Sequence, residues 1–190
     1  RKPAPVVSAG STASRLMNLH SNVFLVGPMG AGKTAVGREL ARHLGCEFLD
    51  SDAELERRTG VDIPFIFEKE GEAGFRRREI QVIEDLSARR HVVLATGGGA
   101  VLAAENRQAL ASRGTVIYLE ASVKQQLLRT RHGDNRPLLQ TADPKGRLKA
   151  LMAQRDPLYR EVADLVVATD GRKVRQVAAE IRSLLEDAGP

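Results

Sequence analysis

One short segment constrains this chain more than any other: Gly27–Thr34, which reads GPMGAGKT. It has the spacing Gly-x-x-x-x-Gly-Lys-Thr and lies between an apolar run at 23–26 and an amphipathic segment that starts at residue 35. In this pattern the glycines let backbone N–H groups curl around phosphate oxygens, the lysine reaches the outer phosphates, and the threonine hydroxyl can bind Mg²⁺. The segment therefore predicts a strand, a phosphate-binding loop and a helix whose positive end faces a nucleoside triphosphate.

Length and composition favour one globular domain. The chain has 190 residues, of which 42% are hydrophobic and 28% charged, which is close to the average for globular proteins. Its one cysteine, Cys46, excludes an intrachain disulfide and a cysteine-based zinc cluster, and it agrees with a cytoplasmic location. No apolar stretch approaches transmembrane length, so we expect no membrane partner.

The net charge of +5 raises the possibility of a nucleic-acid partner, but the distribution of charge argues against it. Arginines alternate with glutamates at 54–58 and at 76–79, whereas a nucleic-acid surface should cluster one sign. We therefore expect no nucleic-acid partner. The surplus of arginine also suits an enzyme whose substrates are all anions.

Residues 1–20 are expected to form a flexible N-terminal extension, because they are rich in Pro, Ser, Ala and Gly and lack a hydrophobic period. Residues 21–190 then form a single domain. Five short apolar segments in it are predicted strands, at 23–26, 47–50, 91–95, 115–119 and 164–168.

Helical patterns alternate with these strands, at 35–44, 106–112, 123–131 and 174–186. A further helix is predicted after the loop at 132–143, and it ends at about residue 160. The pattern between 53 and 89 is helical with expected breaks at Gly60, Pro64, Gly71 and Gly74, and it predicts a helical insertion at about 51–89. Residues 132–143 contain Gly and Pro and predict a mobile loop. Alternation of strands and helices indicates a three-layer α/β fold with a parallel sheet, and ligands should bind beyond the carboxyl ends of its strands.

An acid is missing where many phosphate-loop proteins hold their metal, because the strand at 91–95 runs into Thr96-Gly97-Gly98-Gly99. Asp50 and Asp52 follow a neighbouring strand and are the nearest replacement. One carboxylate could serve the metal side while the other accepts a proton from the acceptor hydroxyl. The alternative is that Ser51 or Asp52 caps the next helix, and the two roles can coexist.

Three successive glycines at 97–99 allow the backbone to approach a ligand closely, which a plain flexible turn does not require. Arg76 and Glu79 share one face of a helix, and by themselves they are more typical of a surface ion pair. Further arginines lie in or around the mobile loop, where a closing lid could bring one onto the transferring phosphate, although solvated loop arginines are the alternative. These are Arg129, Arg131, Arg136 and Arg155.

Taken together, these segments resemble the shikimate kinase family. The resemblance covers residues from about 22 to 170 and rests on the phosphate loop, Asp50-Ser51-Asp52, Gly71-Glu72-x-x-Phe75-Arg76-x-x-Glu79, Thr96-Gly97-Gly98-Gly99, Arg136-Pro137-Leu138-Leu139 and Arg155-x-x-x-Tyr159. It implies a nucleoside-monophosphate-kinase-like P-loop fold with a substrate-binding insertion and a lid. It further implies a monomer that uses ATP and Mg²⁺ to phosphorylate the 3-hydroxyl of shikimate, giving shikimate 3-phosphate and ADP in the chorismate pathway to aromatic amino acids.

The same resemblance implies a role for each site residue. Asp52 would bind the acceptor hydroxyls and serve as base, and Thr34 and Asp50 would lie on the Mg²⁺ side. Arg76 and Arg155 would grip the shikimate carboxylate, as guanidinium groups do well. Glu79 would orient Arg76, the glycines at 97–99 would line the substrate, and Phe67 and Phe75 would wall its ring. The nucleotide would contact Gly30, Ala31, Gly32, Lys33, Thr34, Ala35, Arg129 at the adenine, and Arg136 at the phosphates, with Lys33 and Arg136 acting in catalysis.

Two other functions stay open. Another small-molecule kinase of the same fold, such as one for gluconate, would also use an arginine pair to bind a carboxylate. A non-catalytic ATP-binding module should have lost an acid or the lysine, yet Lys33, Asp50, Asp52 and Arg136 are all present. Contacts to the adenine near 169–173 are not decided by the resemblance, because that segment aligns less firmly.

Overall fold

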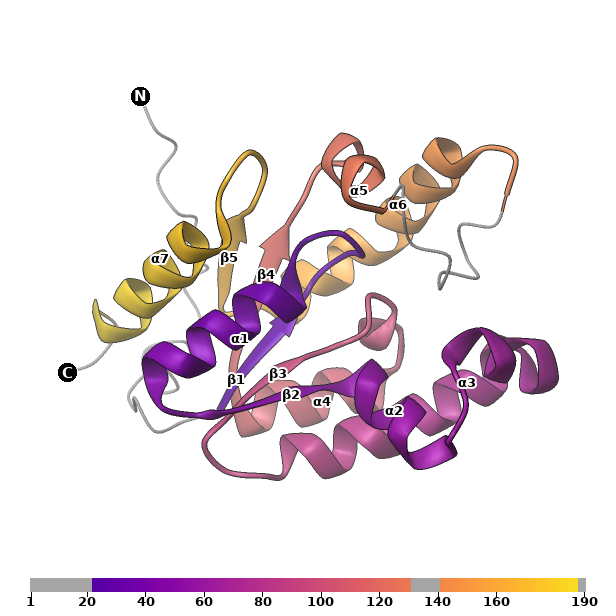
Figure 1. The fold of residues 1–190 in the computed structure, drawn as a ribbon, viewed down its shortest axis with the longest axis horizontal. Helices are drawn as coiled ribbons and strands as arrows, with labels where there is room; N and C mark the ends of the chain where they lie inside the picture. Colours follow the sequence, from indigo (N-terminus) through magenta and orange to yellow (C-terminus); the bar gives the residue numbers. More distant parts are fainter. Residues whose placement is uncertain (1–21, 131–140, 188–190) are drawn as a thin grey trace.

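A parallel sheet forms the centre of the computed structural model, which describes residues 22–130 and 141–187 (Figure 1). The described residues form five strands in the order β2-β3-β1-β4-β5, and every neighbouring pair is parallel. The predicted fold class is thereby confirmed. The strands are β1 (Asn22–Val26), β2 (Glu47–Asp50), β3 (Val92–Ala95), β4 (Gly114–Glu120) and β5 (Leu165–Ala168).

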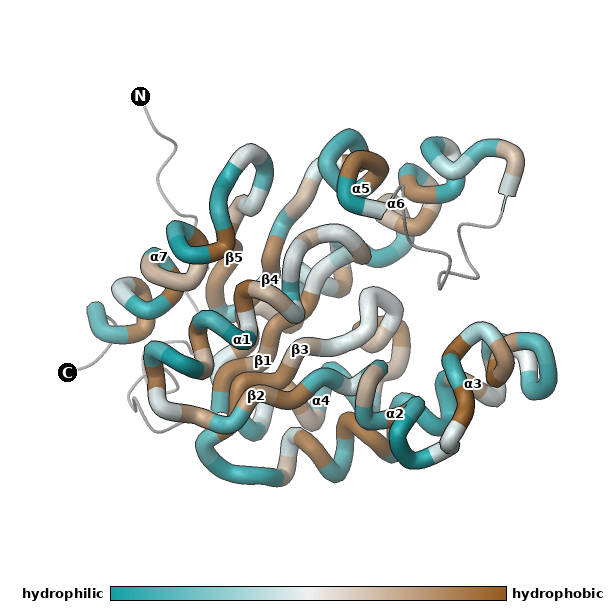
Figure 2. The backbone as a smooth tube through the Cα atoms, in the orientation of Figure 1, coloured by the Kyte–Doolittle hydropathy of each residue, from teal (hydrophilic) through white to brown (hydrophobic). Residues whose placement is uncertain are grey.

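Helices cover both faces of the sheet because its central strands are apolar on both sides. Along β1, Phe24 and Val26 belong to one core cluster, and Val23 and Leu25 belong to the other. This alternation follows from the two-residue period of a strand, and Figure 2 shows the strands as the most hydrophobic part of the chain. The first cluster is covered by α2 (Ser51–Thr59), α3 (Ile63–Ser87), α4 (Ala104–Arg113) and α6 (Pro144–Val162), and the second by α1 (Lys33–Leu44) and α7 (Val174–Asp187).

Two of the four expected breaks between residues 53 and 89 interrupt the helices. Gly60 ends α2 with a left-handed φ of 71°, and Gly71 interrupts α3 with a φ of 67°. Pro64 instead lies in the first turn of α3, where its missing N–H would have had no helical partner. Gly74 is an ordinary helical residue against the Glu70 side chain. The expectation of breaks at Pro64 and Gly74 was therefore wrong.

The register of the sheet brings the predicted site segments to one edge. Asp50 at the end of β2 lies opposite Ala95 at the end of β3, and the Thr96 N–H donates to the Leu25 carbonyl of β1 at 3.1 Å. The phosphate loop, which follows β1, therefore lies beside Asp50 and the glycines after β3. The short helices α5 (Val123–Thr130) and η1 (Ala100–Leu102) follow the strand ends on the same side (Figure 1).

None of the helices in the described residues is both long enough and apolar enough to cross a membrane.

Candidate active site

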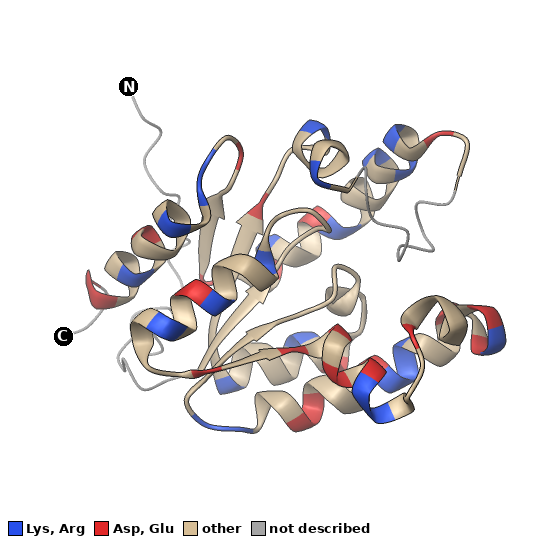
Figure 3. Ribbon diagram, in the orientation of Figure 1, with Lys and Arg blue, Asp and Glu red and all other residues tan. Residues whose placement is uncertain are grey.

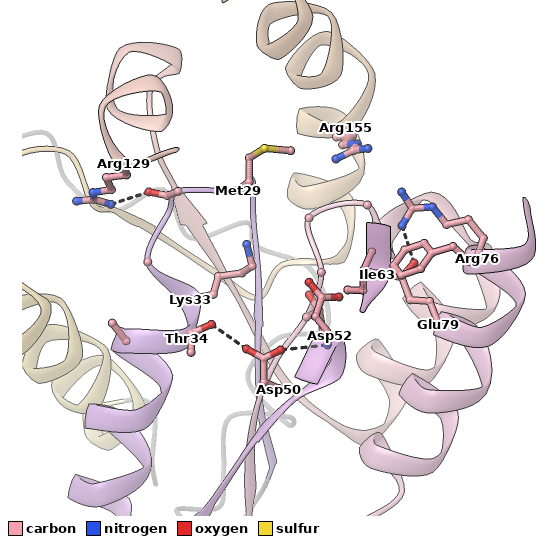
Figure 4. Close-up of a pocket in the computed structure, with 18 of the residues that line it drawn as sticks. Met29, Lys33, Thr34, Asp50, Asp52, Ile63, Arg76, Glu79, Arg129 and Arg155 are labelled. Atoms are coloured by element: carbon pink, nitrogen blue, oxygen red, sulfur yellow. Dashed lines mark hydrogen bonds and ion pairs between the residues drawn. The ribbon is translucent and has the colours of Figure 1, made fainter. Parts of the chain in front are cut away.

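A cavity of about 520 Å³ opens at the carboxyl ends of the strands. It joins the phosphate loop to α3 and α6, and Figure 4 shows Asp52 between Lys33 on one side and Arg76 with Glu79 on the other. The predicted site residues that line it are Gly30, Gly32, Lys33, Thr34, Ala35, Asp50, Asp52, Arg76, Glu79, Gly97, Gly98, Gly99, Arg129 and Arg155, together with the predicted ring walls Phe67 and Phe75.

The phosphate loop takes a backbone course that its glycines permit. Gly30 has a φ of 77° and Gly32 a φ of 89°, both in the left-handed region, and Gly32 caps the start of α1. The ammonium group of Lys33 donates hydrogen bonds to the carbonyls of Gly27 at 2.7 Å and Pro28 at 2.8 Å. Lys33, the one cationic residue of the motif, is thus held against the phosphate loop at the side of the cavity.

Asp50 links the phosphate loop to α2 through its two carboxylate oxygens. Its Oδ2 accepts a 2.8 Å hydrogen bond from the Thr34 hydroxyl, and its Oδ1 accepts from the N–H groups of Asp52 at 3.0 Å and Ala53 at 3.2 Å. The helix cap is therefore Asp50, not Ser51 or Asp52, because α2 starts directly at the strand end. Ser51 instead accepts a 3.0 Å hydrogen bond from the Gly97 N–H.

The Thr34 and Asp50 pair fits Mg²⁺. The ion prefers oxygen ligands and is usually bound by one or two carboxylates together with substrate phosphates and waters. Within residues 22–130 and 141–187, no group of three His, Cys, Asp or Glu side chains could enclose a metal. A site of one hydroxyl and one carboxylate beside a phosphate loop is the arrangement that suits a metal carried in with its nucleotide.

Asp52 is half-buried and lines the cavity. Burial raises the pKa of its carboxyl to about 7, and repulsion from Glu79 and Asp50 adds to the effect. The positive charges of Lys33 and Arg76 oppose this shift without cancelling it. The result is a carboxylate poised to exchange a proton near neutral pH.

Arg76 and Glu79 form a part-buried ion pair rather than the surface pair that their spacing alone suggested. Glu79 is 1% exposed, and its Oε2 lies 2.7 Å from Nη1 of Arg76, while Glu72 accepts from Nη2 at 3.1 Å. The guanidinium also lies 5.0 Å from the ring centre of Phe75, which packs on Phe67. Burial opposes the charge on Arg76, but the two glutamates outweigh it and raise the pKa.

Arg155 faces the cavity from α6, where it is 3% exposed, so it is not a solvated loop arginine. Burial lowers the pKa of its guanidinium. Its Nε makes no hydrogen bond, and neither do Nε of Arg76 and Oε1 of Glu79. The cavity thus holds the buried guanidinium group of Arg155 and the half-buried one of Arg76, each with an unpaired Nε donor, and guanidinium groups are the chemistry that binds a carboxylate.

The triple glycine is required by close approach of the site's own side chains. A Cβ on Gly97 would lie 2.7 Å from Oε1 of Glu79 and 2.8 Å from Oδ1 of Asp52. One on Gly99 would overlap the guanidinium of Arg76. The glycines therefore let the backbone pack directly against the charged groups of the cavity.

Arg129 lies at the phosphate-loop side of the cavity (Figure 4). Its Nη1 donates to the Gly30 carbonyl at 2.9 Å and its Nη2 to the Thr169 carbonyl at 3.2 Å. It thus ties the phosphate loop to the end of β5, and its stacking on adenine stays a prediction. Arg136 and most of the predicted lid lie outside the described residues.

Three lining residues were not predicted: Met29, Ile63 and Thr96. Met29 and Thr96 lie within the two glycine motifs, which was a usable signal for both. Ile63 starts α3 after a cap by Asp62, and an apolar residue at a helix start carries no sign of a ligand site. Only the packing of α3 beside the cavity reveals it.

A phosphate loop that faces a half-buried carboxylate and two guanidinium groups within a three-layer α/β fold defines a P-loop kinase for a small anionic acceptor. The family model described as shikimate kinase matches residues 29–186. The chain belongs to the shikimate kinase family.

Known relatives agree with this placement. The shikimate kinase of Methylococcus capsulatus is 60% identical over 91% of this chain and 97% of its own length. That of Halorhodospira halophila is 61% identical over 87% of this chain and 94% of its own. The solved structure of shikimate kinase from Acinetobacter baumannii in complex with shikimate has a TM-score of 0.87 and 54% identity, and it covers 88% of this chain and 94% of that one.

Proposed function

We propose that this enzyme transfers the γ-phosphoryl group of ATP to the 3-hydroxyl of shikimate within the 520 Å³ cavity, producing shikimate 3-phosphate and ADP. The observation that carries the proposal is the position of Asp52. It lies between the phosphate loop, where the donor would bind, and the arginines Arg76 and Arg155, where an anionic acceptor would bind. One cavity thus offers a donor half and an acceptor half with a carboxylate between them.

The donor half is formed by the phosphate loop and the start of α1. Backbone N–H groups of residues 30–35 bind the phosphates, and Lys33 moves its ammonium from the loop carbonyls to the outer phosphates. Thr34 and Asp50 would hold Mg²⁺, and the ion would neutralise charge on the phosphate oxygens when bound. Arg129 closes this half from the side of the adenine.

The acceptor half is formed by α3, α6 and the glycines after β3. Arg76 and Arg155 bind the carboxylate, and Glu79 holds Arg76 in place through the 2.7 Å ion pair. The segment 51–89 serves as the substrate-binding insertion. The C-terminal part of α3 packs into the core through Ile83 and Leu86, and this packing holds the helix that carries Arg76 and Glu79 in place.

Asp52 acts on the acceptor hydroxyl. It accepts a hydrogen bond from that hydroxyl and takes its proton as the oxygen attacks the phosphorus. With a pKa of about 7, the carboxylate is ionised in a large share of molecules at neutral pH and still basic enough to hold a proton. Arg136 is proposed to meet the transferring phosphate from the lid.

An acceptor panel tests the substrate. ADP release is measured with shikimate, gluconate and nucleoside monophosphates in parallel, and shikimate should give the highest kcat/KM. Faster turnover of gluconate or a nucleotide would identify another kinase of this fold. Absence of turnover with every acceptor, together with intact ATP binding, would favour the non-catalytic module.

We also propose that the enzyme acts as a cytoplasmic monomer without a nucleic-acid or membrane partner. Positively and negatively charged residues are interspersed along α1, α2 and α3, and no long run of one sign follows any of these helices (Figure 3). Light scattering across a range of concentrations should give the mass of a single chain. A mass that doubles as concentration rises would contradict the monomer.

A further inference from the structure

Helix α6 brings a tyrosine as well as an arginine to the acceptor half of the cavity. Arg155 and Tyr159 are four residues apart, so they lie on the same face of the helix, one turn from each other. Tyr159 is fully buried, and its hydroxyl donates a hydrogen bond to the Gly98 carbonyl. Helix α6 therefore carries a guanidinium group and, one turn further along, the hydroxyl that binds the middle glycine of the 97–99 loop.

Gly98 sits at a junction between the two halves of the cavity. A Cβ on this residue would lie 3.3 Å from the Met29 nitrogen of the phosphate loop and 3.6 Å from Nη1 of Arg155. A shift of Gly98 would therefore change its spacing to the donor half and to the arginine at once. The hydroxyl of Tyr159 is the side-chain group that holds the carbonyl of this glycine.

The ring of Tyr159 is itself fixed. It stacks on Tyr118 of β4, with ring centres 4.9 Å apart and an angle of 29° between the rings. The hydroxyl of Tyr118 points elsewhere and donates a 2.7 Å hydrogen bond to Oδ1 of Asp156. Burial raises the pKa of Tyr159 to about 12, so its hydroxyl keeps the proton that it donates.

We propose that Tyr159 is a positioning residue that sets the spacing between Arg155 and the Gly97–Gly99 backbone, and thereby the fit of the acceptor between its carboxylate and its hydroxyl groups. The inference rests on the proposed function, because it takes Arg155 and the glycines as the two ends of the acceptor site. Tyr159 acts through these groups without touching the substrate. The stacked ring and its burial alone would not fix the spacing between Arg155 and the glycine backbone, because only the hydroxyl binds the Gly98 carbonyl.

Two matched variants separate positioning from packing. Tyr159→Phe keeps the stacked ring and removes the hydroxyl, which donates to Gly98 and also interacts with the Arg155 guanidinium. Tyr118→Phe removes a buried hydroxyl from the partner ring in the same stack, and that hydroxyl does not contact the glycine loop. Loss of packing or of a buried hydrogen bond should affect both variants alike, whereas loss of positioning should affect Tyr159→Phe alone.

The kinetic test compares KM for shikimate, KM for ATP and kcat in the three proteins. Tyr159→Phe should raise KM for shikimate roughly five- to tenfold, the effect of one lost hydrogen bond, with KM for ATP within about twofold of wild type. Tyr118→Phe should leave both KM values within about twofold at a similar loss of melting temperature. An unchanged KM for shikimate in Tyr159→Phe, or an equal rise in both variants, would overturn the proposal.

Hydrogen exchange gives a second readout that needs no turnover. The N–H groups of Ala100 and Leu102 donate to the carbonyls of Gly97 and Gly99 in η1, and they should exchange at least about threefold faster in Tyr159→Phe but not in Tyr118→Phe. Unchanged exchange in Tyr159→Phe would show that Tyr159 does not anchor the loop. A wild-type chain that fails to phosphorylate shikimate would instead overturn the proposed function, and the exchange rates would still decide the anchoring.

Discussion

The hydroxyl of Thr34 donates a 2.8 Å hydrogen bond to Oδ2 of Asp50, joining the phosphate loop after β1 to the end of β2. The other oxygen of Asp50 caps α2. One carboxylate thus caps a helix with one atom and, with the other, binds the hydroxyl that is proposed to hold Mg²⁺. Substitution by asparagine separates these tasks, because asparagine caps helices about as well as aspartate but carries no charge.

Asp50→Asn should therefore raise the Mg²⁺ concentration for half-maximal activity at least about tenfold, while the free energy of unfolding changes by less than about 1 kcal/mol. Mg²⁺ titrations and urea unfolding measure the two effects. Thr34→Ser keeps the hydroxyl and serves as the control, with activity near that of the wild type. Unaltered Mg²⁺ dependence in Asp50→Asn would remove this carboxylate from the metal side.

Asp52→Asn should abolish most turnover and leave ATP binding nearly intact, because the variant lacks the proton acceptor but keeps the phosphate loop. In the wild type, kcat/KM for shikimate should fall by about tenfold per pH unit below pH 7, since Asp52 with a pKa of about 7 becomes protonated there. A pH series from 5.5 to 8.5 and calorimetric ATP binding test both points. A flat profile below pH 7, or a variant with an unaltered rate, would exclude Asp52 as the base.

The same pKa makes a prediction for stability. The pKa of Asp52 is raised from 3.8 to about 7 on folding, so the folded state binds the proton more tightly than the unfolded state. The stabilisation that this gives is fully present below about pH 4 and is lost as the pH rises through 7. Asp52→Asn should therefore be more stable than the wild type by roughly 1–3 kcal/mol at pH 8, with a smaller difference at pH 5.

Urea unfolding of both proteins at pH 5 and pH 8 measures this difference. Burial also raises the pKa of Glu79, and its contribution has the same sign. Because Glu79 is present in both proteins, most of its contribution cancels in the comparison. If the wild type were the more stable protein at pH 8, the negative charge of Asp52 would not lower the free energy of unfolding.

Arg155→Lys should raise KM for shikimate at least about tenfold with little change in KM for ATP, because lysine lacks the forked donors that match a carboxylate. Arg160→Lys is the matched control on the same helix, since Arg160 pairs with Glu120 and Asp156 away from the cavity. Steady-state kinetics with each substrate varied in turn give the comparison. Equal effects of the two substitutions would point to a general disturbance of α6.

Gly97→Ala should reduce kcat/KM at least about a hundredfold, because its Cβ would lie 2.7 Å from Glu79 and 2.8 Å from Asp52 and displace both carboxylates. Gly60→Ala is the control: it strains a left-handed φ of 71° in open space and should cost about 1 kcal/mol of stability without altering kinetics. Kinetics and urea unfolding of the pair test the distinction. Full activity in Gly97→Ala would mean that the loop can move to accept a side chain.

Local patterns predicted most of the fold. Three of the signals are local: the apolar run of β1, the glycines that end α1 and α2, and the spacing of the phosphate loop. Each involves only a few neighbouring residues, so the sequence alone predicts the structure that it forms. The absence of an acid after β3 also indicated Asp50 and Asp52 as its replacement, and the register of β2 with β3 places Asp50 opposite Ala95. The local motifs and the family resemblance together predicted sixteen of the residues that line the cavity, Phe67 and Phe75 included.

Burial and long-range contacts could not be read in this way. The spacing of Arg76 and Glu79 is the same for a surface pair and a buried one, and only the packing of α3 beside the glycine loop leaves Glu79 1% exposed. Likewise, Ser51, Asp52 and Asp50 are all capable caps, and the position where β2 ends selects Asp50. Residue type alone therefore predicts neither the burial of Glu79 nor the identity of the residue that caps α2.

By itself, the sequence determined the order of strands and helices, the phosphate loop and the candidate acids and arginines, because these depend on local periodicity and residue type. The tertiary structure alone decided which of these groups lose water and which meet. Tyr159 and Gly98 are 61 residues apart, and their hydrogen bond exists because α6 packs against the loop after β3. The pKa of Asp52 near 7 has the same origin, since burial and neighbouring charges are properties of the folded chain.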